Sequence, residues 1–173
     1  MTAAMLPGAR EADALQDEKL KLSQWKQSMG QFATGVVVIT ARDASGNAVG
    51  TTVSAFSSVS LQPRLLLACL DRQSRTLAAI RQSGCFAVNV LAAGEAELAF
   101  NFGRKGSDQF AGVSHVYGVL GCPLLDRVCT RVECHLEAIH AGGDHDILIG
   151  RPEQVEVMAG DAPLVYYAGR FLP

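Results

Sequence analysis

The residues best suited to chemistry begin with an uncharged segment that is rich in hydroxyl groups. Residues 50–60 read Gly-Thr-Thr-Val-Ser-Ala-Phe-Ser-Ser-Val-Ser, so six of the eleven side chains carry a hydroxyl and none is charged. Hydroxyls and exposed backbone N–H groups can line the site of a flat polar ligand. The same composition suits a polar edge strand followed by a turn, because Thr and Val favour strands and Ser favours turns. Composition alone leaves both interpretations open.

A second polar segment, residues 71–76, is a candidate anion site. It reads Asp-Arg-Gln-Ser-Arg-Thr and opens a short predicted helix. With Ser74 or Thr76 as the helix cap, unbonded N–H groups at the helix start would lie beside Arg72 and Arg75. An ordinary capped helix with solvated arginines explains the segment equally well.

A histidine that follows a Gly-Gly turn is the third candidate. Asp144-His145 stands at the predicted start of a strand, where the imidazole could donate a hydrogen bond to a ligand or shield a reactive face. A turn histidine bonded to local backbone is the alternative. His135, His140 and His145 recur at five-residue steps, but odd spacing places successive residues on opposite faces of a strand, so we expect no metal site.

Common catalytic motifs are missing from the sequence. No G-x-G-x-x-G follows a predicted strand, and there is no Walker loop, no H-E-x-x-H and no C-x-x-C. No serine lies in a nucleophile elbow. We interpret the five cysteines as small apolar fillers, and their odd number without paired spacing fits a reducing cytoplasm.

Composition describes a compact and rather apolar chain. Its 173 residues are 49% hydrophobic, enough for one domain with a real core and for extra apolar surface in a homodimer interface. The net charge of −2 shows no basic footprint for nucleic acid or for a membrane surface. We expect residues 1–16 to be a flexible tail that is not a signal peptide, and residues 17–173 to be the domain. No apolar run has the length of a membrane span. The cysteine usage gives a cytoplasmic location as the expectation.

The elements that would position these candidates are mostly strands. A helical pattern from about residue 17 places Leu22, Trp25, Met29 and Phe32 at three- and four-residue steps. Further helices are predicted from Thr76 and over residues 94–102. Strands are predicted over the apolar runs at residues 36–41, 65–70, 86–91, 130–138, 147–158 and 163–167.

The segment 130–138 has the clearest strand pattern. Its apolar residues share one face, and Arg131, Glu133, His135 and Glu137 share the other, as in an antiparallel sheet with one packed face and one exposed or polar-interface face. Phe110 stands alone in a polar loop, either as a core anchor or as a lid. Strands joined by turns, with three short helices inserted, predict a mainly β protein whose fold is a mainly antiparallel barrel.

Six motifs occur in an order that resembles the flavin reductase-like family. These are small NAD(P)H:flavin oxidoreductases that supply reduced flavin to two-component monooxygenases. The resemblance implies a Greek-key split β-barrel of the FMN-binding type, FMN or FAD as the flavin, NADH or NADPH as the hydride donor, a homodimer, and a separate flavin-dependent monooxygenase as partner. The motifs are residues 29–36, 52–63, 69–76, 86–91, 143–145 and 163–167.

The resemblance also implies a role for each matching residue. The flavin would contact a strand, a helix start and the end of a second helix: Ala48, Val49, Gly50, Thr51, Thr52, Ser54, Ala55, Cys69, Leu70, Asp71, Ser74, Arg75, Thr76, Asn101 and Phe102. The nicotinamide would contact Gly143, Asp144, His145 and Tyr167, with His145 as the residue at the reacting ring. In such hydride transfer the protein stacks two cofactors and tunes their surroundings, which needs no nucleophile and no metal.

Two departures from the family pattern leave details open. The usual Pro-Pro is Pro63-Arg64, and the usual Asp-Lys-Phe is Asp108-Gln109-Phe110. The missing lysine leaves open how phosphates are held in that loop and whether FMN or FAD is used. A non-catalytic flavin-binding module for storage or sensing is the main alternative, and a heme or pyridoxamine-phosphate protein on a related barrel is another.

Overall fold

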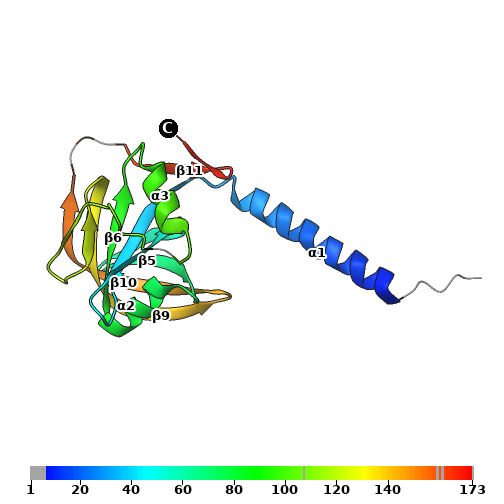
Figure 1. Cartoon of the computed structure of the whole chain (residues 1–173), viewed down its shortest axis with the longest axis horizontal. Coiled ribbons are helices and arrows are strands. Elements are labelled where there is room, and N and C mark those ends of the chain that lie inside the picture. The colour runs from blue at the N-terminus through cyan, green and yellow to red at the C-terminus, as the bar shows by residue number, and fades with distance from the viewer. Residues whose placement is uncertain (1–6, 107, 159, 161, 173) are drawn as a thin grey trace, which may run out of the picture.

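The protein is mainly β, with a long N-terminal helix that stands away from the body (Figure 1). A computed structural model describes residues 7–106, 108–158, 160 and 162–172, with side chains described from residue 15 onward. The helices of the described residues are α1 (Pro7–Met29), α2 (Arg75–Ser83) and α3 (Ala96–Gly103). The strands are β1 (Thr34–Gly35), β2 (Val37–Arg42), β3 (Ala48–Val53), β4 (Phe56–Leu61), β5 (Arg64–Asp71), β6 (Cys85–Leu91), β7 (His115–Tyr117), β8 (Pro123–Leu125), β9 (Val128–Gly142), β10 (His145–Val157), β11 (Val165–Tyr167) and β12 (Arg170–Leu172).

Seven strands form one antiparallel sheet in the order β3-β2-β6-β9-β10-β5-β4. Small sheets of β1-β11-β12 and β7-β8 pack beside it. Strands β3 and β4 are the two edges, and no backbone ladder joins them within the part of the chain that the structure describes. The mainly β class is therefore confirmed, whereas closure into a barrel is not.

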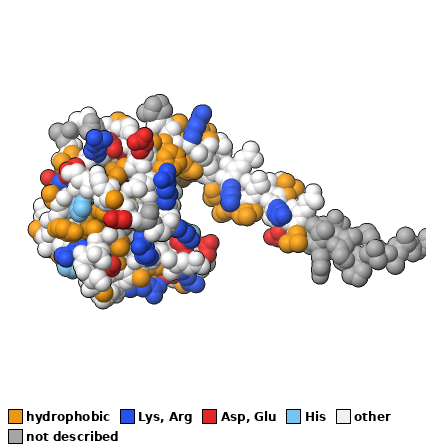
Figure 2. Space-filling view, viewed as in Figure 1, with side chains coloured by type: hydrophobic (Ala, Val, Ile, Leu, Met, Phe, Trp, Pro, Cys, Tyr) orange, Lys and Arg blue, Asp and Glu red, His pale blue; other side chains and the backbone are white. Residues whose placement is uncertain are grey.

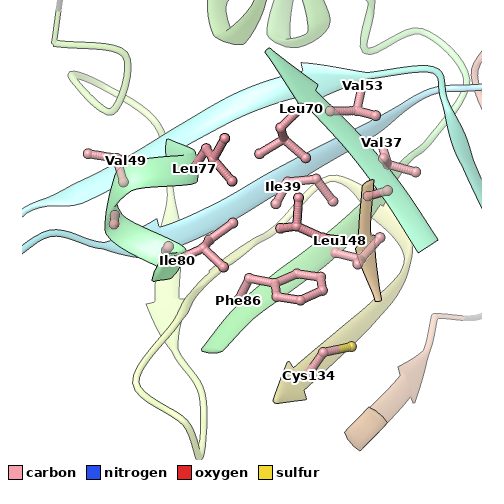
Figure 3. Close-up of a cluster of buried hydrophobic side chains, with 14 of the residues drawn as sticks. Val37, Ile39, Val49, Val53, Leu70, Leu77, Ile80, Phe86, Cys134 and Leu148 are labelled. Carbon is pink, nitrogen blue, oxygen red and sulfur yellow. The ribbon is translucent and has the colours of Figure 1, made fainter. Parts of the chain in front are cut away.

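The main core lies between the concave side of the curled sheet and α2. Figure 3 shows side chains from β2, β3, β5, β6, β9 and β10 converging with Leu77 and Ile80 of α2. Phe86, Leu70 and Leu148 are at most 1% exposed. Burial of such side chains stabilises the fold by about 1.5–3 kcal/mol each, and it holds α2 against the sheet so that its N-terminus has a defined position.

The polar face of β9 is covered over the first part of the strand, at Arg131 and Glu133. Arg131 and Glu133 are 9% and 1% exposed, because the β7–β8 hairpin packs over them. The Arg131 guanidinium donates to the Leu125 carbonyl at 2.7 Å, and the Glu133 carboxylate accepts from the backbone of the preceding turn. This face is therefore a polar contact at Arg131 and Glu133, whereas Glu137 further along it is exposed.

Helix α1 begins at Pro7, ten residues before the predicted start. Its apolar side chains Leu15, Leu22, Trp25 and Met29 are 64%, 52%, 62% and 49% exposed. Figure 2 shows orange apolar atoms along a helix that touches the body only at its base. Of the tail that was predicted over residues 1–16, residues 7–16 lie in α1, and residues 1–6 lie outside the described residues.

Candidate functional site

The N-terminus of α2 is built by a turn that the sequence encodes locally. The Ser74 hydroxyl accepts from the backbone N–H of Leu77 at 3.4 Å, with Ser74 in an extended conformation as N-cap. The Asp71 carboxylate accepts from the backbone N–H of Gln73 at 2.8 Å. This bond lowers the pKa of Asp71, and a hydrogen bond from Lys105 lowers it further. Ser74 is thus confirmed as the cap. The helix start presents backbone N–H groups and the positive end of its dipole.

A pocket of about 300 Å³ opens at this helix terminus. Four segments meet there: β3, the end of β5, the start of α2 and the loop after α3. Arg75, Arg104 and Lys105 make the pocket basic, and Lys105 Nζ lies 3.3 Å from the Asp71 carboxylate. Cations beside a helix N-terminus favour an anionic ligand group. The lining residues are Gly50, Thr51, Asp71, Gln73, Ser74, Arg75, Thr76, Gly103, Arg104, Lys105, Gly106 and Gln109.

Gln109 holds the loop that forms one wall of this basic pocket. Its side chain is 7% exposed, and its amide donates to the carbonyls of Phe102 at 3.1 Å and Arg104 at 2.8 Å. The Asn101 amide donates back to the Gln109 carbonyl at 2.6 Å. These bonds satisfy carbonyls at the C-terminal end of α3, which have no partner inside the helix. The residue that departs from the family pattern therefore shapes the pocket wall.

Gly50 is a position where only glycine fits. A Cβ atom there would lie 2.8 Å from Cδ1 and Cε1 of Phe102, closer than carbon atoms pack. Phe102 is 1% exposed, and its ring packs edge-on against Phe110 at a centroid distance of 5.0 Å. The pocket wall therefore rests on a tight contact between β3 and α3. Phe102 belongs to a second cluster of buried apolar side chains, and Phe110 packs against this cluster as an anchor in the core.

The predicted Gly-Asp-His turn joins β9 to β10 next to the basic pocket. Gly143 and Asp144 form a two-residue hairpin loop, with Gly143 at a φ of +73°, as type II′ turns require. His145 lies opposite Asp71 in the β10–β5 ladder, and its Nδ1 is 2.8 Å from the Asp144 carboxylate. This contact lowers the pKa of Asp144. The ladder thus brings His145 beside the start of the predicted anion site.

Asp146 anchors this turn to α2. Its side chain is 4% exposed and accepts from Arg72 at 3.0 Å and from Arg81. The hydrogen bonds from these two arginines lower the pKa of the Asp146 carboxyl, and the bond from Arg72 has the larger effect. The Arg72 backbone N–H also donates to the Asp144 carbonyl at 3.1 Å. A buried carboxylate therefore holds the histidine turn, the end of β5 and α2 together.

A larger and more apolar pocket of about 870 Å³ begins at Ser54, directly after the end of β3. Ser54 and Ala55 of the hydroxyl-rich segment line it together with aromatic residues from distant parts of the chain. The Ala55 carbonyl accepts from the Cys69 N–H at 3.0 Å, which ties the segment to β5. The lining residues are Trp25, Lys26, Met29, Gly30, Phe32, Thr34, Ser54, Ala55, Phe56, Ser57, Leu67, Tyr166 and Gly169.

The remaining predicted site residues have other surroundings. Val49 and Leu70 have buried side chains in the main core, so only their backbone could face a ligand, and Ala48 begins β3. The Thr52 hydroxyl donates to the Ala99 carbonyl at 2.7 Å and pins α3. Asn101 lines a separate pocket of about 490 Å³. The Tyr167 hydroxyl donates to the Gln31 side chain at 3.0 Å.

Six residues that line the basic pocket were missed by the sequence reasoning: Gln73, Gly103, Arg104, Lys105, Gly106 and Gln109. The basic dipeptide Arg104-Lys105 between two glycines was the available signal. Gln109 was noticed only as an absent lysine. Within the described residues there is no group of three or more His, Cys, Asp and Glu side chains placed to hold a metal. No helix among them has the length and apolarity needed to cross a membrane.

The chain was compared with known families and proteins. The family described as "Flavin reductase like domain" matches residues 29–173. The reductase subunit HsaB of a flavin-dependent monooxygenase from Rhodococcus jostii is 37% identical over 158 residues, covering 91% of this chain and 80% of that protein.

Solved structures agree with the sequence match. Nitrilotriacetate monooxygenase component B from Mycobacterium thermoresistibile superposes with a TM-score of 0.85 at 32% identity, covering 90% of this chain and 87% of that one. The NADH:FAD oxidoreductase SgcE6 from Streptomyces globisporus, in complex with NAD and FAD fragments, superposes with a TM-score of 0.82 at 29% identity, covering 99% and 96%. The match to the family over most of the chain, with this agreement in fold, shows that the chain belongs to the flavin reductase-like family.

Proposed function

We propose that this protein reduces FMN or FAD with NADH or NADPH and delivers the reduced flavin to a separate monooxygenase. The observation that carries the proposal is the basic pocket at the capped N-terminus of α2, joined by one strand to a large apolar pocket. Relatives named as a monooxygenase reductase subunit and as an NADH:FAD oxidoreductase support the reaction and the partner.

The two pockets fit the two ends of a flavin nucleotide. The phosphate would bind the α2 N–H groups and Ser74, with Arg75 and Lys105 balancing its charge. The ring would lie toward Ser54 and Ala55, in the pocket with the larger apolar lining. Thr51 and Ser54 are three residues apart, at most about 10 Å along an extended chain, so one elongated molecule can contact both pockets.

The histidine turn supports a place for the nicotinamide. His145 lies across the ladder from Asp71, and Asp144 holds one ring nitrogen, which leaves the other nitrogen to face a ligand. When bound, nicotinamide and flavin supply the hydride chemistry themselves. The contribution of this chain is to hold the two rings in contact and to exclude water from the space between them. Tyr167 and Gly143 complete the proposed nicotinamide side.

The quaternary structure is a further part of the proposal. We infer a homodimer, because the apolar stripe of α1 and the groove beside it, which Trp25 and Met29 line, are large exposed apolar surfaces. The curled seven-stranded sheet would work as a Greek-key split barrel. The odd number of cysteines in the sequence, five without paired spacing, favours a cytoplasmic location. Light scattering of the purified protein tests the dimer, and a monomer at micromolar concentration would contradict it.

Steady-state oxidation of each nicotinamide, followed at saturating FMN, FAD or riboflavin, tests the function. Flavin-dependent oxidation supports it. Tight flavin binding without oxidation would instead indicate a storage or sensing module. A matched ligand pair tests the pocket assignment: Ser74→Ala should raise the KM for FMN but not for riboflavin, which has no phosphate. His145→Ala should raise the KM for the nicotinamide more than the Kd for the flavin, and equal losses would contradict its role.

A further inference from the structure

Two thiols that the proposed reaction does not use lie side by side. Cys85 is the first residue of β6 and is half-buried, and Cys122, just before β8, is 1% exposed. Their sulfur atoms are 3.7 Å apart. The Cys85 sulfur also lies 3.7 Å from the Leu120 carbonyl, so its side chain points at the turn that carries Cys122. The two residues are 37 positions apart in sequence, and only the tertiary fold brings them together.

Both sides of this pair are held in place. The turn from Gly118 to Cys122 is closed by the Gly118 N–H donating to the Cys122 carbonyl at 3.0 Å. The buried Glu133 carboxylate accepts from the backbone N–H groups of Val119 at 2.7 Å and Leu120 at 2.9 Å. On the other side, Cys85 belongs to β6, an interior strand of the seven-stranded sheet. The sulfurs are therefore close because of two fixed backbones and not because of one mobile loop.

A small oxidant has a route to the pair. A hollow of about 340 Å³ lies over it, and both cysteines belong to its lining together with Arg42, Ser83 and Leu120. Cys85 is the more exposed of the two thiols, so an oxidant entering from solvent meets it first. A disulfide bond measures about 2.0 Å, so the sulfurs need to approach by about 1.7 Å from their 3.7 Å separation.

We propose that Cys85 and Cys122 form a reversible disulfide when the protein meets hydrogen peroxide. The Cys85 thiolate attacks one peroxide oxygen, the O–O bond breaks, and the products are a sulfenic acid and hydroxide, which takes up a proton to become water. The Cys122 sulfur then attacks the Cys85 sulfur, its proton is lost, the S–O bond breaks and a second water leaves. In total, two thiols and one peroxide give one disulfide and two waters, and a dithiol reductant reverses the change.

The proposed function would supply this oxidant, and only this point rests on that function. Reduced flavin released in air reduces dioxygen to hydrogen peroxide when no monooxygenase receives it. The bridge would then close when flavin reduction exceeds the demand for reduced flavin. It would tie β6 to the turn before β8 and close a covalent loop over residues 85–122.

Peroxide added directly to the purified full-length protein, without flavin or nicotinamide, tests the bridge independently of the proposed function. Thiol titration after denaturation should fall from the five thiols of the reduced chain to three. Peptide mapping without reductant should show the Cys85 and Cys122 peptides linked, and dithiothreitol should restore all five thiols. The rate of closure should not depend on protein concentration, because the reaction is intramolecular.

Variants make the assignment specific. Cys122→Ser should leave a sulfenic acid on Cys85 that dimedone traps, whereas Cys129→Ser, which changes a half-buried thiol elsewhere, should still form the bridge. The oxidised protein should unfold roughly 4–16 °C above the reduced protein. Retention of all five thiols in wild type, linkage of a different pair, or closure that speeds up with protein concentration would overturn the proposal.

The source of the oxidant has its own test. In air, NADH or NADPH, each tested with FMN and with FAD, should close the bridge in at least one combination, and catalase should prevent closure. If added peroxide closes the bridge but neither nicotinamide with a flavin does, the link to the proposed function is wrong while the modification site stands. If neither closes it, the site itself is wrong.

Discussion

Gly50→Ala tests the contact on which the basic pocket rests. Gly50 lies on the edge strand β3, and its Cα faces the Phe102 ring of α3. A methyl group at this position would lie 2.8 Å from two carbons of that ring and 3.4 Å from the Ile39 carbonyl. Phe102 is 1% exposed and packed against Phe110, so it cannot turn away without moving other side chains. The substitution should therefore push α3 and its C-terminal loop outward.

The expected magnitude follows from two opposing effects. Overpacking of a core contact costs about 1–3 kcal/mol. Replacing a strand glycine by alanine returns about 0.5–1 kcal/mol of backbone entropy. The net loss in the free energy of unfolding should be about 0–2.5 kcal/mol, which lowers the Tm by up to roughly 10 °C for a chain of this size. The KM for flavin should rise, because Gly50 and the displaced loop both line the pocket.

Gly35→Ala is the matched control, since Gly35 also lies in a strand and no atom would approach its Cβ within 4 Å. It should keep or slightly raise the Tm measured by differential scanning calorimetry. A double-mutant cycle with Phe102→Leu isolates the contact: the smaller side chain should relieve part of the cost, with a coupling energy of at least about 0.5 kcal/mol. Equal Tm changes in the two alanine variants, or additive effects in the cycle, would refute the reasoning.

Three other predictions concern the groups around the site. Asp146→Asn should destabilise the protein above about pH 4 and should do so less as the pH falls. The reason is that the two arginines lower the pKa of the Asp146 carboxyl in the folded state below its ordinary 3.8. The ionised carboxylate therefore stabilises the fold above the unfolded-state pKa, and this stabilisation is lost as the pH drops through the folded-state pKa. Urea midpoints from pH 7 down to pH 3 check this, and a wild-type advantage that stays constant with pH would contradict it. Ser74→Ala should lower the stability by about 0.5–2 kcal/mol through loss of the α2 cap, measured by urea unfolding, while Ser83→Ala, at the other end of the same helix, serves as control. Gln109→Leu should lower the free energy of unfolding by about 1–3 kcal/mol, because it leaves buried carbonyls without a donor, and it should raise the KM for FMN. Gln109→Lys should restore most of the stability and most of the FMN affinity. A Leu variant with wild-type stability would show that these hydrogen bonds contribute little.

The elements of this protein could be predicted from sequence because their signals are local. Apolar runs predicted β2, β5 and β6, and the Ser74 cap predicted the start of α2 within two residues. Periodicity found α1 but not its first turns, because the Ala-rich segment before residue 17 has no apolar repeat. The order of six short motifs was enough to place the chain in its family, since motif order reflects the whole fold even where each motif alone is weak.

Contacts between distant segments were decided only by the tertiary structure. The charged face of β9 alternates like a solvent-exposed strand, yet Glu133 and Arg131 are buried, because a hairpin that follows no periodic pattern packs over them. The sequence likewise treated Gly50 to Ala55 as one wall, whereas the bend after β3 sends Thr51 to a basic pocket and Ser54 to an apolar one.

Sequence by itself determined the hydrophobic pattern, the helix cap, the tight histidine turn and the family, because each depends on residues that are neighbours along the chain. It could not determine that Lys105 meets Asp71, that His145 faces Asp71 across a ladder, or that Cys85 meets Cys122. Those contacts join segments separated by tens of residues, and their positions depend on strand register and on the packing of buried side chains. Tertiary structure therefore decided which of the candidate groups act together.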